Sequence, residues 1–227
     1  MTNKELINHI IHLYQKANQL TEGFHNDAVV RGRRHTISSM VEDLLAGFIQ
    51  QRIGDPSLRY WVDYALSYTP PGANRAKTIY PDIAVVRKVG GTNVVLAIID
   101  VKMDLGWKRD FGTRMPDIAA DIKQLRQAKR ANRRVPDEEG TKQNESVRIS
   151  DALKLKYAIM SDQNGSAAGF EANRLAAANQ SGEIQLYAFT SGHYLGYATP
   201  DNIKILGNEI DQFITDLKAD TASAHSA

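Results

Sequence analysis

Two carboxylates and one ammonium group lie close together in the sequence, and their types suit phosphodiester hydrolysis. Asp82 follows Pro81, and Asp100 and Lys102 end the apolar segment Val94–Met103. Carboxylate oxygens are hard ligands that suit Mg²⁺, and a bound metal polarises phosphoryl oxygens and lowers the pKa of its water. A lysine can orient or deprotonate that water, or stabilise charge on the phosphate. The alternative is a turn aspartate after a proline and a surface ion pair at a strand end.

The spacing of these residues indicates how they could meet. Residues two apart on a strand point to the same face, so Asp100 and Lys102 share one. The pair Gly90-Gly91 predicts a tight hairpin turn between two strands. That turn would bring Asp82 near Asp100, although the register is not fixed by the sequence.

Several basic residues could contact phosphates. Five of them fall on one arc of a helix predicted over Pro116–Arg134, two precede the second predicted helix, and two follow Lys102 closely. A solvated basic face and an ordinary loop are the alternatives. These residues are Lys123, Arg126, Arg130, Arg133 and Arg134 on the helix, Arg33 and Arg34 before the second helix, and Lys108 and Arg109 after Lys102.

Apolar periodicity predicts the elements that position these groups. Helices are expected over Lys4–Gln19, Thr36–Ile53, Pro116–Arg134, Ala167–Asn179 and around Ile210–Leu217. Strands are expected over Tyr60–Tyr68, Ile79–Val89, Val94–Met103, Leu155–Ser161, Glu183–Thr190 and Tyr194–Ala198, and loops over Thr69–Lys77 and Val135–Ser150. This alternation of helices and strands predicts an α/β fold around a mixed sheet.

Pro81-Asp82 followed by Asp100-Val101-Lys102 resembles the PD-(D/E)xK superfamily of restriction-endonuclease-like nucleases. The core of that superfamily runs helix, three strands, helix, strand, which matches the order predicted from Thr36 to Ser161. The resemblance implies a three-layer α/β/α sandwich with extra N- and C-terminal elements. It also implies that Asp82 and Asp100 ligate the metal and that Lys102 serves the attacking water.

Many members of the superfamily add an acidic residue from the helix before the first strand. Glu42 and Asp43 are the candidates here. The apolar stripe of that helix leaves Asp43 on the solvated side and Glu42 on the flank, so Glu42 is preferred as a third metal ligand. A boundary glutamate with only helix-surface contacts is an equal alternative.

Composition excludes several other classes. The chain has 227 residues, no cysteine and a formal net charge of +2, so thiolate metal sites and disulfides are excluded. No membrane-spanning segment, signal peptide or Gly-rich nucleotide loop is evident, and we expect a cytoplasmic protein with no organic cofactor. We expect one nuclease domain over residues 1–218, with a core at about 36–161, additions at 1–35 and 162–218, and a disordered tail at 219–227.

These observations predict an Mg²⁺-dependent endonuclease, with Mn²⁺ as a substitute, that acts on double-stranded DNA as a homodimer. A type II restriction endonuclease is the leading hypothesis. The alternatives are a repair, junction-resolving or phage-processing nuclease of the same superfamily, or a non-catalytic nucleic-acid-binding module on that fold.

Overall fold

The computed structural model describes residues 1–24, 37–103, 112–136, 142–161, 174–180, 182–192, 195–196 and 198–223. Four long helices and one 3-10 turn are present in these ranges: α1 (Asn3–Phe24), α2 (Ser38–Ile53), η1 (Gly112–Arg114), α3 (Met115–Ala128) and α5 (Gly207–Ser223). Residues 174–178 form a further short helix. Gly54 ends α2 in the left-handed conformation that glycine adopts without a steric penalty, and Pro116 lies in the first turn of α3.

The strands form one large mixed sheet and one small ladder. The large sheet contains β1 (Leu58–Val62), β2 (Leu66–Tyr68), β3 (Lys77–Ile79), β4 (Ile83–Val89), β5 (Thr92–Lys102), β6 (Arg130–Pro136), β7 (Lys142–Ile149), β8 (Leu155–Ile159) and β9 (Ile184–Ala188). The small ladder pairs β10 (Thr190–Ser191) with β11 (Lys204–Ile205). The predicted α/β fold with a mixed sheet is confirmed.

The order of the strands gives the sheet its shape. Its main path runs β1-β4-β5-β7-β6-β2-β3, and β8 and β9 branch from β5. The strands β1, β4 and β5 are antiparallel neighbours, whereas β8 lies parallel to β5 and to β9. Helix, three strands, helix and strand therefore follow one another as predicted, with β2–β3 and the β6–β7 hairpin as insertions.

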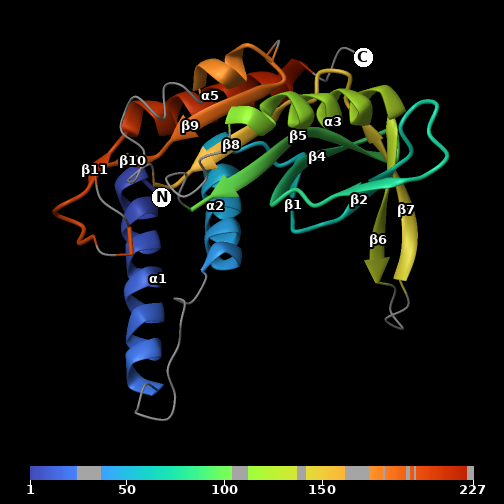
Figure 1. Cartoon of the computed structure of the whole chain (residues 1–227). Helices are drawn as coiled ribbons and strands as arrows, with labels where there is room; N and C mark the ends of the chain where they lie inside the picture. The colour runs from blue at the N-terminus through green and yellow to red at the C-terminus, as the bar shows by residue number, and fades with distance from the viewer. Residues whose placement is uncertain are drawn as a thin grey trace.

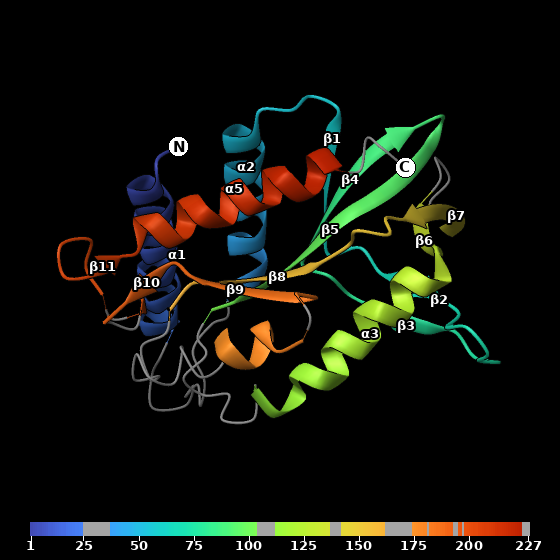
Figure 2. The same cartoon turned by 90° about the horizontal axis from the view of Figure 1, so that it is seen from above.

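Helices lie against both faces of this sheet. One apolar core joins α1, α2 and α5 to the sheet through buried residues such as Ile10, Leu45 and Phe213. A second core lies beneath α3 and contains Ile122 and Leu125. Figure 1 shows the elements, and Figure 2 shows α5 and α3 on opposite sides of β8 and β9. Within the described ranges, no helix combines the length and apolarity needed to cross a bilayer.

Two predicted strands are each broken in the structure. The strand predicted over Tyr60–Tyr68 is interrupted at Asp63, whose φ of 53° is incompatible with extended backbone. The strand predicted over Ile79–Val89 is interrupted at Pro81, because proline lacks the N–H that a ladder needs. The Gly90-Gly91 turn is confirmed: both residues have positive φ, and Val89 pairs with Thr92.

The helix predicted over Pro116–Arg134 is too long. It ends at Ala128, where Lys129 takes the left-handed conformation and its N–H bonds to the carbonyl of Arg126. The chain then enters β6, so Arg130, Arg133 and Arg134 lie on a strand and not on one helical arc. The loop predicted over Val135–Ser150 is also wrong, because β7 pairs with β6 along most of its length.

Three predictions near the C-terminus change as well. The tail predicted to be disordered from Ala219 is helical as far as Ser223, and residues 224–227 lie outside the described ranges. The described residues of the strand predicted over Tyr194–Ala198 (195, 196 and 198) form no strand. Of the helix predicted over Ala167–Asn179, residues 174–178 are helical and residues up to 173 are not described.

Candidate active site

Asp82 and Asp100 lie opposite each other immediately beyond Ile83–Ile99, the first pair of the β4–β5 ladder. The antiparallel register pairs Ile83 with Ile99, so the residue before Ile83 lies opposite the residue after Ile99. The two carboxyl groups share a hydrogen bond. The amide of Val101 donates to Oδ2 of Asp82 at 2.5 Å. The hairpin that Gly90-Gly91 nucleates therefore brings together the two carboxylates predicted from the sequence.

The environment of Asp82 holds a proton on this pair near neutral pH. Burial, the hydrogen bond to Asp100 and the charge of Asp100 raise the pKa of Asp82 to about 7, against the opposing effects of the Val101 amide and Lys102. Two carboxylates so close together cannot both ionise without a compensating cation. The pair carries negative charge that the neighbouring side chains compensate only in part.

Lys102 lies on the same face of β5 as Asp100 and forms an ion pair with it. Its ammonium is also 5.5 Å from the centre of the Tyr157 ring. The ion pair and the ring fix the lysine beside the carboxylates, with its ammonium partly exposed. The predicted grouping of Asp82, Asp100 and Lys102 is therefore present in the structure.

Tyr157 is a site residue that the sequence did not reveal. It lies on β8, directly beside Asp100 in the parallel β5–β8 ladder. Burial, the charge of Asp100 and a hydrogen bond to Asp100 all raise the pKa of its hydroxyl, which therefore stays protonated and donates to that carboxylate. The strand itself was predicted, but the register of a parallel pair is set by packing and carries no local sequence signal.

Glu42 flanks the carboxylate pair from the other side of the sheet. It lies on α2, which packs in the core opposite to the one that contains Tyr157. Burial raises the pKa of Glu42, and the charges of Asp63, Asp43 and Asp100 raise it further. Glu42 therefore lies within electrostatic range of Asp100, whereas Asp43 is exposed. The choice of Glu42 over Asp43 agrees with this geometry, and its role as a metal ligand stays a prediction.

Asp63 is the second residue beside the site that the sequence did not reveal, and it adds a further carboxylate. It occupies the break between β1 and β2, and its amide donates to the carbonyl of Asp82 at 3.0 Å. This bond fixes the backbone that carries Asp82. In the sequence Asp63 lies within what reads as a continuous aromatic strand, so the break could not be seen.

The donor set fits a hard divalent cation bound through few protein ligands. Among the described residues, no group of three or more acidic or histidine side chains is arranged to hold a metal ion. Mg²⁺ needs less than that, because it commonly uses one or two carboxylates and takes its other ligands from water and phosphate. The juxtaposition of the two carboxyls supports this fit, and the raised pKa of Asp82 agrees with it, because a cation would replace the proton that this pKa favours.

The predicted phosphate contacts are only partly brought together. Lys123 is exposed on α3 and Arg130 is exposed on β6, but Arg126 forms an ion pair with Glu183, and both side chains are largely buried. Arg126 therefore holds α3 to the loop before β9, and its guanidinium is not free to bind a phosphate. Four predicted contacts lie outside the described residues: Arg33, Arg34, Lys108 and Arg109.

Arg114 lies immediately before α3 and adds a second basic side chain beside the site. It is exposed, and its charge lowers the pKa of the Tyr157 hydroxyl. The N-terminus of α3 begins at the next residue and adds backbone donors with a positive dipole end. A phosphate beside Asp100 would therefore meet positive potential from this helix.

Comparison of the chain with protein families, curated proteins and solved structures gave no match, so its candidate site stands on residue chemistry and geometry alone.

Proposed function

We propose that this protein is a metal-dependent nuclease that hydrolyses phosphodiester bonds in DNA at the Asp82, Asp100 and Lys102 site. The observation that carries the proposal is the placement of the Asp82 and Asp100 carboxyls opposite each other on adjacent strands, beside a partly exposed lysine that pairs with Asp100. An arrangement that served stability alone would balance its charges. A divalent cation that displaced the proton from Asp82 would gain two carboxylate ligands here, and a phosphodiester would supply further ligands for it.

The side chains divide the work of the proposed reaction. Asp82 and Asp100 would hold Mg²⁺ or Mn²⁺, with Glu42 as a candidate outer ligand. The bound ion would polarise the phosphoryl oxygens and lower the pKa of a bound water. Tyr157 donates to Asp100 and so orients that carboxylate. Lys102 would position the attacking water or stabilise charge on the phosphate, and Arg114 would attract the phosphate.

The observed topology supports the restriction-endonuclease-like assignment. The meander β1, β4 and β5, followed by α3 and the parallel strand β8, has the order that the resemblance implies. We propose a type II restriction endonuclease that acts as a homodimer, since cutting both strands of a duplex uses two active sites. Repair, junction-resolving or phage-processing nucleases remain the alternatives within the same chemistry.

Plasmid cleavage tests the proposal. Supercoiled DNA would be incubated with the protein in Mg²⁺, Mn²⁺ or EDTA, and the parent compared with Asp82→Asn and Lys102→Met. The matched controls are Asp151→Asn and Lys204→Met, which change exposed residues that do not belong to the site. We expect metal-dependent cleavage by the parent and both controls only. Equal cleavage by parent, Asp82→Asn and Lys102→Met would refute the assignment.

The non-catalytic binding module is a second candidate because no group of three metal-type side chains occurs among the described residues. Isothermal titration with Mg²⁺ and Mn²⁺ separates the two. A nuclease should bind a divalent ion in a manner that Asp82→Asn abolishes. A binding module should retain DNA while showing neither metal binding nor cleavage.

A further inference from the structure

The described side chains on one face of the β6–β7 hairpin are all polar or basic and exposed. Alternate residues of the two strands share a face, and the register pairs Arg130 with Arg148, Asn132 with Ser146 and Arg134 with Asn144. All six residues are exposed. We name this set the ribbon face: Arg130, Asn132, Arg134, Asn144, Ser146 and Arg148. It contains three arginines, two asparagines and a serine, and no carboxylate.

The opposite face of the hairpin packs against the body of the protein. Ala131 and Val147 are buried in the core, and the guanidinium of Arg133 lies 3.7 Å from the centre of the Trp61 ring. Glu145 accepts from Arg133 at 2.6 Å and also from Asn93 of β5. These contacts hold the hairpin rigidly to the body. In the part of the chain that the structure describes, the ribbon-face side chains make no hydrogen bond or ion pair.

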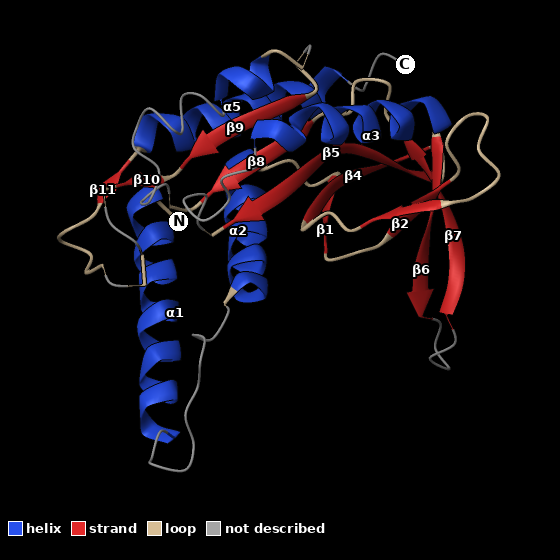
Figure 3. Cartoon of the chain, in the orientation of Figure 1, coloured by secondary structure: helices blue, strands red, loops and turns tan. Residues whose placement is uncertain are grey.

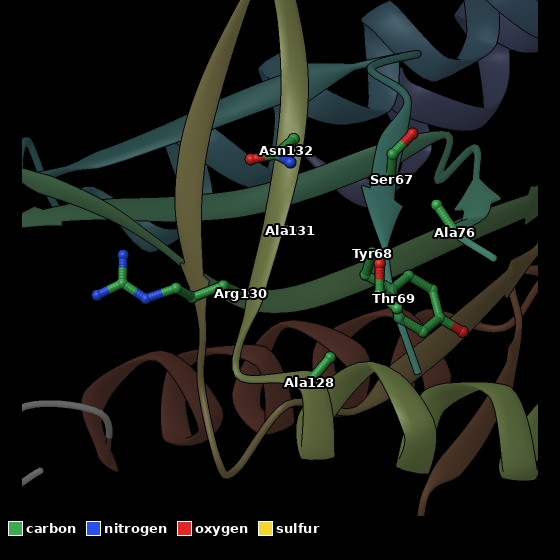
Figure 4. Close-up of a pocket in the computed structure, with 8 residues that line it drawn as sticks. All are labelled: Ser67, Tyr68, Thr69, Ala76, Ala128, Arg130, Ala131 and Asn132. Carbon is green, nitrogen blue, oxygen red and sulfur yellow. The ribbon is translucent and has the colours of Figure 1, made fainter. Parts of the chain in front are cut away.

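The polar surface continues beyond the hairpin onto its neighbours. Asn132 pairs with Ser67 of β2, and Ser67 pairs with Thr78 of β3. Together with Ser146, these residues form a row of uncharged hydrogen-bonding groups across four strands. Figure 4 shows Arg130 and Asn132 on β6 beside Ser67 on β2, where they border a pocket of about 280 Å³. Figure 3 shows the hairpin extending away from the body of the protein.

The chemistry of the ribbon face selects one class of partner. Arginine pairs with guanine and asparagine with adenine through two hydrogen bonds each, and a two-stranded ribbon fits the major groove of B-form DNA. Protein interfaces need aromatic or apolar anchors, and single strands need aromatic stacking platforms. The face has neither. The deep major groove of A-form RNA does not admit such side chains.

The base of the hairpin lies close to the carboxylates along β5. The base of β7 pairs with β5 at Val95, five residues before Asp100. At about 3.3 Å per residue this is roughly 17 Å along β5, which is about half of one turn of B-DNA. The ribbon face lies on the side of the sheet away from Ala131 and Val147, whereas Asp100 lies on the same side as Tyr157, whose core also contains Ala131 and Val147.

We propose that the ribbon face binds the major groove of duplex DNA and reads base edges there. The inference rests on the proposed nuclease function for its substrate, but it concerns binding and not hydrolysis. It also replaces the helical arc predicted from the sequence: of that arc, Arg130 and Arg134 contribute through a strand.

Binding should be measured by fluorescence anisotropy on a labelled duplex pool of about 30 base pairs, roughly three turns, with randomised sequence and EDTA present. The variants are Arg134→Gln, Arg148→Gln and their double mutant, which leave the packed face intact. Lys204→Gln and Lys88→Gln are matched controls on other surfaces, and Lys123→Gln tests the exposed face of α3. Thermal melting checks that each variant is folded.

We expect the double mutant to bind roughly tenfold or more weakly than the parent and the controls to change little. Its salt dependence should also fall, by roughly 0.9 in slope for each phosphate that the variant no longer neutralises. Selection of bound sequences should enrich a motif with the parent and a weaker one with Asn132→Ala. Unchanged affinity in the folded double mutant overturns the proposal. Equal binding of single-stranded DNA or duplex RNA overturns the choice of the B-form groove.

The two proposals can fail separately. If the parent cleaves plasmid and the ribbon variants cleave and bind as well as it does, the nuclease stands and the ribbon inference is wrong. If the ribbon variants lose duplex binding and no divalent ion supports cleavage by the parent, the ribbon inference stands and the nuclease assignment fails. Absence of both binding and cleavage by the parent overturns both.

Discussion

Asp82, which lies just before β4, and Lys156 of β8 are both ionisable residues with substantial burial, yet their surroundings balance charge differently. Lys156 has no exposed surface, and its ammonium lies 2.7 Å from Oδ2 of Asp220, a residue of α5. It also donates to Gln185 on the neighbouring strand. Burial lowers the pKa of Lys156, while the hydrogen bond to Asp220 opposes the shift. Asp220 therefore supplies the counter-charge of Lys156 from within the protein.

The Asp82–Asp100 pair is left with a charge imbalance. Its near neighbours are one lysine, a tyrosine and two further carboxylates, Glu42 and Asp63. A balanced buried pair contributes to packing, whereas an unbalanced one must recruit a proton or a cation from outside. The comparison indicates that net charge of the cluster, more than burial of a charged group, distinguishes a candidate site from a structural ion pair.

The largest expected effect is on cleavage. Asp100→Asn should reduce metal-dependent plasmid cleavage by about 10³-fold or more, because it removes a metal ligand and the partner of both Lys102 and Tyr157. Circular dichroism should show an unchanged fold. The comparison breaks if Lys156→Met, assayed as folded protein, reduces cleavage as strongly as Asp100→Asn does.

Lys156→Met should instead act on stability. The change leaves Asp220 without its buried partner, so the free energy of unfolding should fall by about 3–5 kcal/mol in urea denaturation. Lys154 also contacts Asp220, at 3.2 Å, and it serves as the control: Lys154→Met should cost much less because this lysine is partly exposed. A decrease in Lys154→Met as large as in Lys156→Met would show that burial is not the cause.

Whether the sequence predicts a contact in these two regions depends on how far apart along the chain its residues lie. The Asp82–Asp100 contact follows from a hairpin of two adjacent segments, and Gly90-Gly91 predicts its turn. Tyr157 and Asp220 enter through contacts between distant segments, for which periodicity gives no register. The β6–β7 hairpin was missed because its outer positions are polar and its inner ones hold Arg133 and Glu145, so apolar alternation is weak. No glycine marks the end of α3, since Lys129 takes that conformation.

A smaller effect concerns the stability of the metal-free protein against pH. The folded-state pKa of Asp82, about 7, lies above its ordinary value of 3.8. The folded protein therefore holds a proton that the unfolded chain releases, and stability falls as pH rises between these values. Asp82→Asn removes this dependence, so it should be more stable than the parent by on the order of 1 kcal/mol at pH 8. At pH 4 the two proteins should melt alike. A parent that gains stability from pH 5 to 7 relative to Asp82→Asn contradicts the proton-sharing geometry.

Metal binding should depend on the protonation of Asp82. Mg²⁺ should raise the melting temperature of the parent more at pH 8 than at pH 6, because the ion competes with the proton on Asp82. Asp82→Asn should respond weakly at both values, and Asp151→Asn should behave as the parent. A rise in melting temperature that does not depend on pH would show that the metal does not bind at the Asp82–Asp100 pair.

The smallest effect is expected at Glu42. It is partly exposed and acts from the other face of the sheet, so Glu42→Gln should lower cleavage only a few-fold, on the order of 0.5–1 kcal/mol in the barrier. Asp43→Asn, at the neighbouring exposed position, is the control and should leave the rate unchanged. A decrease as large as that of Asp100→Asn would make Glu42 an inner ligand and enlarge the cluster.

The break at Asp63 has a consequence for how the molecule folds. β1 and β2 are separated by three residues, yet β1 pairs with β4 a short way along the chain, whereas Leu66 of β2 pairs with the distant Arg133. Local hairpins form in about 1–10 μs, and pairings between distant segments are slower. We therefore expect the β4–β5 hairpin, which brings Asp82 and Asp100 together, to form early and the pairing between β2 and β6 to form late. The contact between Asp82 and Asp100 would be assembled first, and the polar row from Asn132 to Ser67 would be completed only when β2 and β6 pair.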